Sequence, residues 1–151
     1  LLMKIKKLII LSKKIENALL MIWVVSLTAT LGSLYFSEVR GYEPCTMCWY
    51  QRILMYPIVL MTTVAYIQKN AKIAATTAVF SCIGAAISLY HYSLQKLDFL
   101  QDSAPSCGIV PCTGEYINWL GFITIPFLAL TAFVIIAGIS FYMLKVLKEE
   151  K

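Results

Sequence analysis

The sequence predicts an all-α membrane protein, an antiparallel bundle of four transmembrane helices with two outward-facing loops that carry cysteines. Three observations support this fold class. The chain has 151 residues, of which 60% are hydrophobic and only 14% are charged. Four long stretches are almost free of charge, and most basic residues lie in alternate connections between them. The fold is expected to be a single domain over residues 1–151.

The composition excludes several classes of protein. Soluble domains average about 45–50% apolar and about 25% charged residues. A soluble domain of about 150 residues buries only about 70% of the surface that its unfolded chain exposes. A cytosolic enzyme, a disordered protein and a nucleic-acid module are therefore all excluded, and lipid is the expected surroundings.

Four segments have roughly the 20 apolar residues that a helix needs to cross a hydrocarbon core of about 30 Å. Helices are expected because lipid leaves the backbone groups of open strand edges unsatisfied. Pro57 and Pro126 are expected to kink their helices without ending them. The predicted spans are about 18–36, 50–67, 73–94 and 119–144.

The basic residues predict the orientation. Ten of the thirteen Lys and Arg residues lie before the first span, between the second and third, or after the fourth. Because such residues concentrate on the cytoplasmic side, both termini are expected there, with outer loops over 37–49 and 95–118. The net charge of +5 is thus a topology signal. Residues 1–16 are expected to form a short surface helix before a first span that is not cleaved.

Four of the five cysteines lie in the two predicted outer loops, as the pairs Cys45/Cys48 and Cys107/Cys112. Disulfides form and persist outside the cytoplasm. Four cysteines allow three connectivities that sequence alone leaves open, although local spacing favours 45–48 and 107–112. The fifth, Cys82, lies mid-span and is expected to be a small buried apolar residue.

The C-x-x-C spacing of Cys45 and Cys48 is typical of a reactive pair. A disulfide across so short a loop adds little stability, whereas such a pair often holds a thiol more acidic than the free value of about 8.5. Pro44 and the span that follows place the pair at or just before a helix N-terminus, where the helix dipole stabilises an anionic sulfur. Arg52, one turn beyond Cys48, would stabilise that thiolate or an anion developing on a bound acceptor.

Alternatives stay open for the other residues at this boundary. His91, late in the third span, is either a satisfied interfacial histidine or a hydrogen-bond donor to a ligand in the outer leaflet. The cysteines would also suit a zinc site, or inert disulfides in a four-span scaffold. The aromatic residues form an interfacial belt or wall a flat cofactor: Trp49, Tyr50, Tyr90, Tyr92 and Trp119.

The segment Pro44-Cys45-Thr46-Met47-Cys48-Trp49-Tyr50-Gln51-Arg52 resembles the signature of the DsbB family of membrane disulfide-generating proteins. Leu89-Tyr90-His91 and Trp119-Leu120-Gly121 extend the resemblance over most of the chain. The short chain and the close second pair are most similar to BdbC-type members of Gram-positive bacteria. In larger proteobacterial members the second pair lies farther apart than the four residues between Cys107 and Cys112.

The resemblance implies a thiol:quinone oxidoreductase of the bacterial cell membrane, with its active site on the outer face. Such an enzyme reoxidises an extracytoplasmic thioredoxin-fold thiol oxidase of the DsbA or BdbD type and so supports disulfide formation in secreted proteins. The electrons pass to a membrane quinone, menaquinone or ubiquinone. The alternative enzyme is a vitamin K epoxide reductase-like quinone reductase, and the alternative of another class is a scaffold or metal-binding protein.

The resemblance also implies roles for individual residues. Cys107 would be attacked by the partner's thiolate, and Cys112 would then exchange with Cys45. Cys48 would pass the electrons to the quinone beside Arg52. His91 would help to hold the quinone.

Overall fold

The computed structural model describes residues 1–102, 111–115 and 117–149, so Cys107 lies outside the described part of the chain. The described residues are helical apart from connections and one isolated bridge between Trp119 and Ile123. The elements are α1 (Leu2–Leu34), the π-helical turn η1 (Tyr35–Val39), α2 (Thr46–Gln68), α3 (Ile73–Lys96), α4 (Asp98–Gln101) and α5 (Ile125–Glu149).

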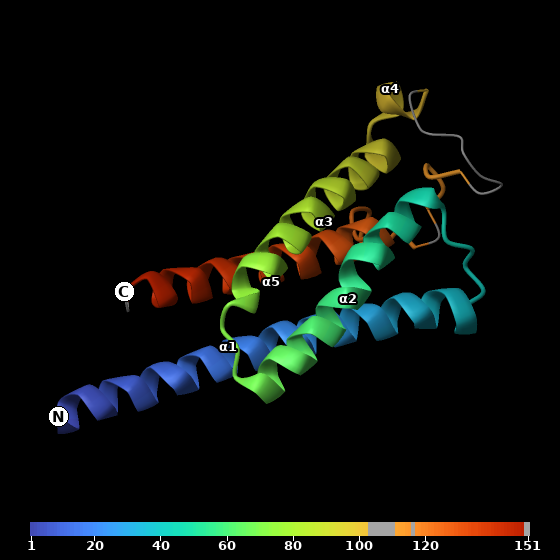
Figure 1. Ribbon diagram of the computed structural model, residues 1–151. Coiled ribbons are helices and arrows are strands. Elements are labelled where there is room, and N and C mark those ends of the chain that lie inside the picture. The colour runs from blue at the N-terminus through green and yellow to red at the C-terminus, as the bar shows by residue number, and fades with distance from the viewer. Residues whose placement is uncertain (103–110, 116, 150–151) are drawn as a thin grey trace.

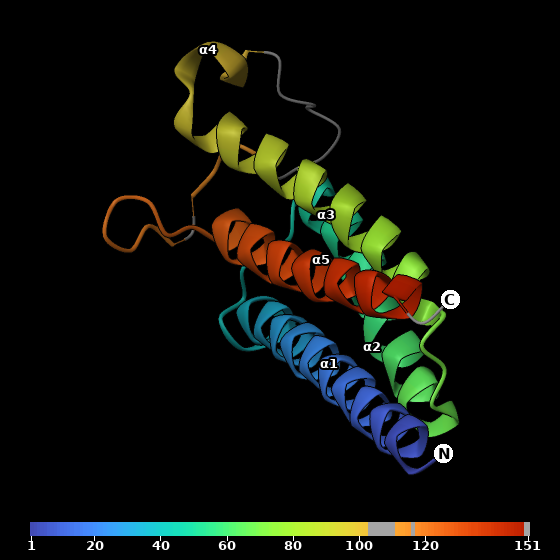
Figure 2. The same cartoon turned by 90° about the vertical axis from the view of Figure 1, so that its left-hand side faces the viewer.

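The four long helices pack side by side. Figures 1 and 2 show both termini at one end of the molecule, together with the turn between α2 and α3. The connection from α1 to α2, the short helix α4 and the described residues just before α5 lie at the other end. The most extensive contact is between α3 and α5, while α1 packs on α2 and α5, and α2 packs on α3.

Three segments of the described chain are long and apolar enough to cross a membrane: Ser12–Val39, Ile73–Lys96 and Ile125–Glu149. They correspond to the first, third and fourth predicted spans. The helix expected as the second span, α2, is not among them, because Gln51, Arg52 and several hydroxyl residues lower its hydropathy. Its crossing of the membrane stays a prediction.

The interior of the bundle combines large apolar residues such as Leu19, Ile22 and Phe133 with many small and weakly polar ones. Ser26, Thr62, Ser81 and Ser88 are fully buried, and the Thr77 and Ser140 hydroxyls hydrogen-bond each other over 2.9 Å between α3 and α5. Large apolar side chains also point outward. Leu60, for example, has 70% of its surface exposed. Small residues between helices and apolar residues outside are typical of packing in lipid.

Two expectations about α1 and α3 are wrong. Residues 1–16 do not form a separate surface helix, because α1 continues unbroken for 33 residues to Leu34, with neither glycine nor proline before Gly32 to interrupt it. Cys82 is exposed rather than buried. The face of α3 that meets its neighbours carries Ser81 and Gly84, which turns Cys82 away from them.

The last long helix begins at Ile125, six residues after the start of the predicted span at residue 119, and continues to Glu149. The residues before it form a tight turn closed by the bridge from Trp119 to Ile123. Leu120 and Gly121 take positive φ angles of 56° and 81° in this turn, a conformation that a helix does not allow. The Thr124 carbonyl then accepts the Leu128 amide, which opens the helix.

Candidate active site

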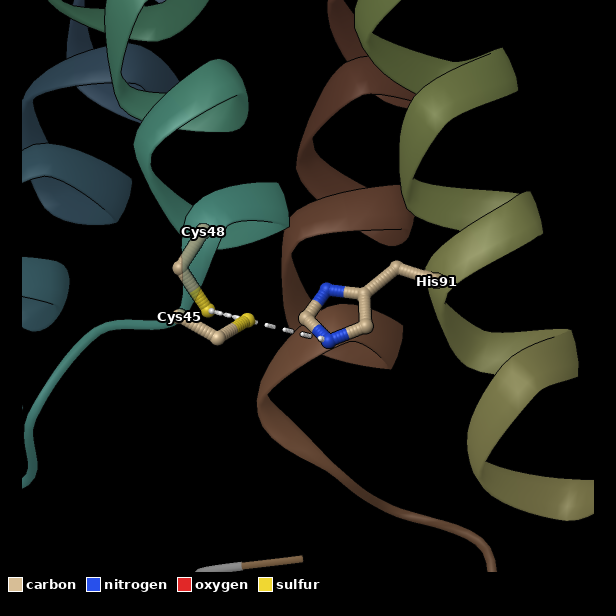
Figure 3. A group of neighbouring side chains, drawn as sticks. All are labelled: Cys45, Cys48 and His91. Carbon is tan, nitrogen blue, oxygen red and sulfur yellow. Dashed lines mark hydrogen bonds between the residues drawn. The ribbon is translucent and has the colours of Figure 1, made fainter. Parts of the chain in front are cut away.

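Cys45 and Cys48 lie at the N-terminus of α2, as the sequence predicts. Cys45 is the residue before the helix, with extended backbone angles (φ −73°, ψ 173°), and its carbonyl accepts the Trp49 amide at 3.2 Å. Cys48 lies one turn in. The two sulfurs are 3.5 Å apart as thiols rather than as the expected disulfide, and the Cys45 thiol donates to Cys48 Sγ (Figure 3).

His91 reaches this pair from α3. Figure 3 shows its ring pointing at Cys45, with Nε2 at 3.6 Å from Cys45 Sγ. The same nitrogen is 3.1 Å from the carbonyl oxygen of Cys112, and Nδ1 is 3.1 Å from Nε2 of Gln51. His91 and Gln51 are both buried, with 1% and 6% of their surfaces exposed. The histidine therefore joins α2, α3 and the segment before α5.

These contacts fix the tautomer of His91. A carbonyl oxygen only accepts hydrogen bonds, so the nitrogen that faces Cys112 must carry a proton. In the neutral ring Nδ1 is then the acceptor, which matches the side-chain amide group of Gln51 as its donor. His91 thus presents one N–H to both the Cys112 carbonyl and the Cys45 sulfur.

The contacts of His91 bear on the zinc alternative. Cys45, Cys48 and His91 offer three ligand atoms within 4.8 Å of one another, and two sulfurs with one imidazole suit Zn²⁺. However, the imidazole nitrogen next to the sulfurs already faces the Cys112 carbonyl at 3.1 Å, and binding of an ion there would break this hydrogen bond. The arrangement fits thiol chemistry better than metal binding.

Cys112 lies over the start of α2. It is buried, its side chain interacts with the Cys45 thiol, and the backbone amides of Thr46 and Met47 hydrogen-bond toward its sulfur. Three of the four predicted reactive cysteines are therefore together at one helix N-terminus. Free amides at such an end stabilise an anionic sulfur, which suits a cysteine that must act as a thiolate.

The expected acidification does not hold for Cys45. Its hydrogen bond to Cys48, reinforced by burial, raises the pKa of the Cys45 thiol to about 11. Burial also raises the pKa of the Cys112 thiol, against the opposing effect of the two amides. In this reduced arrangement Cys45 is a proton donor, and its sulfur stays neutral at ordinary pH.

A cavity of about 500 Å³ lies between α1, α2 and α5. Cys48, Gln51 and Arg52 form part of its wall from α2, whereas Cys45 and His91 do not line it. Most of the remaining wall is apolar and includes Val25, Ala29, Leu128, Ala132 and Phe133. Cys48 thus borders both this cavity and a smaller space beside His91, whereas Cys45 lines the smaller space but not the cavity.

Arg52 is held against α1 at the cavity wall. Its Nε donates to Ser33 Oγ at 2.9 Å and one Nη to the Ser33 carbonyl at 3.1 Å. The guanidinium also lies over the ring of Trp49, 5.3 Å from its centroid. Two of the five N–H groups of an arginine are used in these bonds, so a fixed positive charge with spare donors stands at the cavity.

The sequence did not identify the aromatic residues of this cavity. None of the five boundary aromatics considered as a wall lines it, and the rings that do are Phe36, Tyr42, Tyr56 and Phe133. A signal for α2 was present. Positions 48, 51, 52, 55 and 56 follow the i, i+3, i+4, i+7, i+8 pattern of one helix face, which carries Tyr56 to the same side as Cys48 and Arg52.

Comparison with known proteins decides the family. Residues 15–143 match the family described as Disulfide bond formation protein DsbB. The chain belongs to the DsbB family. The resemblance seen in the C-x-x-C signature is therefore confirmed, and it extends over most of the chain. Membership makes the protein one of a family of disulfide formation proteins.

Relatives of this DsbB-family chain bear the name disulfide formation protein C. A "Probable disulfide formation protein C" of Halalkalibacterium halodurans is 64% identical over 125 residues, which cover 83% of this chain and 91% of the relative. A protein of the same name from Bacillus cereus is 56% identical over 133 residues, 88% of this chain and 96% of the relative. The "Disulfide bond formation protein C" of Bacillus subtilis is 54% identical over 114 residues, 76% and 83% of the two chains. No solved structure matches the chain significantly.

Proposed function

We propose that this protein is a membrane thiol:quinone oxidoreductase that reoxidises an extracytoplasmic thioredoxin-like disulfide oxidase. The electrons pass to a membrane quinone, menaquinone or ubiquinone, and the cycle supports disulfide formation in secreted proteins. One observation carries the proposal beyond family membership: the two sulfurs of the C-x-x-C pair face different surroundings. Cys45 faces Cys112, and Cys48 borders the largely apolar cavity.

The proposed setting is a four-span antiparallel bundle in the bacterial cell membrane with both termini in the cytoplasm. The placement of ten basic residues in alternate connections supports this orientation. The outward face of α2 supports its crossing, since Ile53, Leu60 and Ile67 are 61%, 70% and 75% exposed. A helix with such a face gains by contact with lipid in spite of Gln51 and Arg52, which both point to the protein interior.

Thiol exchange would pass between the two cysteine pairs. The partner's thiolate attacks Cys107 of a Cys107–Cys112 disulfide, and the electron pair of the broken bond leaves on Cys112. The Cys112 thiolate attacks Cys45 of the Cys45–Cys48 disulfide, forms a Cys112–Cys45 bond and releases Cys48 as a thiolate. Such exchange needs an attacking thiolate close to an accessible disulfide sulfur. The position of Cys112 beside Cys45 supplies the closeness that this exchange needs.

The cavity fits a quinone. Its volume of about 500 Å³ lies in the range of ligand pockets, about 300–1,000 Å³, and its apolar wall suits a ring with a hydrocarbon tail. The Tyr56 hydroxyl is buried without a hydrogen-bond partner in the described chain, as expected of a donor that awaits a ligand. A quinone bound there would supply a two-electron acceptor. Arg52 and Tyr56 would hold its oxygens, while Cys48 would meet it as a thiolate.

The proposal is tested with purified full-length protein in detergent. A reduced thioredoxin-fold thiol oxidase is added with decylubiquinone or a menaquinone analogue, and the quinone absorbance is followed. The absorbance is expected to fall with the wild type, to stay constant with Cys48→Ser, and to fall normally with Cys82→Ser, because Cys82 lies on the outward face of α3. A wild-type protein that leaves the quinone oxidised, or equal loss in both variants, would refute the proposal.

A further inference from the structure

The C-terminal end of α3 binds the segment that carries Cys112 through a series of side chains. Gln95 Nε2 donates to the Gly114 carbonyl at 3.0 Å, and Lys96 Nζ donates to the Gly121 carbonyl at 3.0 Å and pairs with Glu115 at 2.9 Å. His91 begins this series one turn earlier, at the Cys112 carbonyl. Among these three side chains His91 alone also contacts a cysteine sulfur.

We propose that His91, oriented by Gln51, is a positioning residue for the exchange between Cys112 and Cys45 rather than part of the quinone cavity. The inference deepens the proposed function and depends on it. Nε2 of His91 is 3.1 Å from the backbone oxygen of Cys112 and 3.6 Å from Cys45 Sγ. A single N–H group therefore holds the backbone of one reacting cysteine and touches the sulfur of the other.

The bond that His91 prepares is the disulfide between the pairs. When the Cys112 sulfur attacks Cys45, the Cys45–Cys48 bond breaks and its electron pair leaves on Cys48, so no further oxidant enters the step. Holding two reacting groups in contact removes the entropy cost of bringing them together, and a displacement of about 1 Å costs such a reaction up to about a hundredfold. Loss of the His91 bond removes the contact of α3 with the Cys112 backbone itself and leaves Gln95 and Lys96, which hold residues farther along the segment.

Gln51 has the second role in this arrangement. It is buried on α2 between Cys48 and Arg52, and its amide faces Nδ1 of His91 at 3.1 Å. This contact keeps Nδ1 as an acceptor and so keeps the proton on Nε2, where both the Cys112 carbonyl and Cys45 need it. Without Gln51 the ring loses the contact at Nδ1 and is held at Nε2 alone.

The position of His91 argues against a direct role at the quinone. The cavity lies between α1, α2 and α5, and its wall includes Cys48, Gln51 and Arg52 but not His91. The histidine instead lines a much smaller space together with both Cys45 and Cys48, and of these three residues Cys48 alone also lines the cavity. The C-x-x-C pair stands between His91 and the cavity.

The test isolates the exchange step. In the full-length chain Cys48, Cys82 and Cys107 are replaced by serine, and the protein in detergent is equilibrated with glutathione redox buffers. Cys45 and Cys112 form a disulfide as oxidised glutathione is reduced to two thiols, and alkylation with mass spectrometry gives the fraction formed. His91→Leu is expected to lower the effective concentration of the two thiols by about tenfold or more. His91→Gln, which keeps an N–H donor, is expected to restore most of it.

Matched variants keep the result interpretable. Ser88→Ala lies one turn earlier on α3 at a fully buried position whose hydroxyl has no hydrogen-bond partner among the described residues, and it is expected to leave the equilibrium unchanged. Gln51→Leu is expected to lower the effective concentration of the two thiols less than His91→Leu does. If His91→Leu does not fold, Gln51→Leu is used in its place. Equal values for wild type, His91→Leu and Gln51→Leu would overturn the proposal.

A second measurement separates this proposal from a quinone role. With all cysteines present, dithiothreitol reduces the Cys45–Cys48 pair directly and decylubiquinone is the acceptor. His91→Leu is expected to keep the KM for decylubiquinone while the rate with a thioredoxin-fold thiol oxidase falls. A raised KM with an unchanged glutathione equilibrium would assign His91 to the quinone. Failure of the proposed function gives a different result. The wild type would then reduce no quinone, while His91→Leu would still shift the glutathione equilibrium.

Discussion

Phe133 of α5 packs against Gly84 of α3 so closely that a Cβ atom at position 84 would overlap the phenylalanine ring. Phe133 is fully buried and also lines the cavity between α1, α2 and α5. The contact between α3 and α5 therefore sets the position of one wall of the proposed quinone site.

Gly84→Ala is expected to push the Phe133 ring toward the cavity. Overpacking of this kind costs typically about 1–3 kcal/mol, so thermal unfolding in detergent should occur at a lower temperature and the KM for decylubiquinone should rise. Gly84→Ala combined with Phe133→Leu should recover part of the loss. Gly138→Ala is the control, because nothing lies within 4 Å of a Cβ there. An unchanged Tm in Gly84→Ala would show that α3 and α5 move apart at no cost, which would contradict this prediction.

The anchoring of Arg52 by Ser33 predicts a graded effect on quinone use. Arg52→His removes the fixed charge and should raise the KM for decylubiquinone strongly. Ser33→Ala removes one hydrogen bond, the 2.9 Å contact to Nε, and should raise the KM several-fold at most, since the backbone carbonyl still holds the guanidinium. Steady-state kinetics with dithiothreitol as reductant measure both. Lys72→His, at the exposed turn between α2 and α3, should change nothing, and equal KM values in all variants would remove Arg52 from the site.

The Tyr56 hydroxyl, which has no hydrogen-bond partner within the described part of the chain, predicts two effects of opposite sign. An unsatisfied buried polar group costs about 1–3 kcal/mol, so Tyr56→Phe should raise the Tm of the ligand-free protein. If the hydroxyl binds a quinone oxygen, the same substitution should raise the KM for decylubiquinone by roughly tenfold, the equivalent of one hydrogen bond. Thermal unfolding and kinetics on one preparation test both signs. A higher Tm with an unchanged KM would exclude Tyr56 from binding.

The pKa of Cys45 predicts how its alkylation depends on pH. In the reduced protein the thiol should react with iodoacetamide at half its maximal rate near pH 11, because its bond to Cys48 and burial raise its pKa to about 11 from an ordinary 9.0. Cys48→Ala removes the largest cause and should move the profile toward lower pH. A raised folded pKa also means that stability present below about pH 9 is lost as the pH rises through about 11. Identical profiles in both proteins would contradict the Cys45–Cys48 hydrogen bond.

The features predicted correctly depend on local sequence. The C-x-x-C pair at a helix N-terminus follows from Pro44 and the apolar run behind it, and three of the four long helices follow from length and hydropathy. The inner face of α3 was harder to find, because this helix is apolar nearly all round. Small and polar residues mark that face instead, at Thr77, Ser81, Gly84, Ser88 and His91. Cys82 lies one position off this stripe, which explains why it points outward.

The features that sequence could not supply depend on contacts between helices. The direction in which His91 points is set by Gln51 on α2 and by the Cys112 carbonyl, which are distant in the chain. The raised pKa of Cys45 depends first on its hydrogen bond to Cys48, which is local, and then on burial, which needs the folded bundle. The late start of α5 depends on a turn with positive φ at Leu120, which composition does not reveal.

The position of Cys48 at the cavity wall has a consequence for side reactions with small soluble thiols. Small hydrophilic reductants partition poorly into the largely apolar cavity between α1, α2 and α5. They therefore gain little direct access to the Cys48 sulfur that borders it. In the proposed function, a quinone bound there would be shielded at Cys48 from small soluble thiols, which would have to react at Cys45 instead.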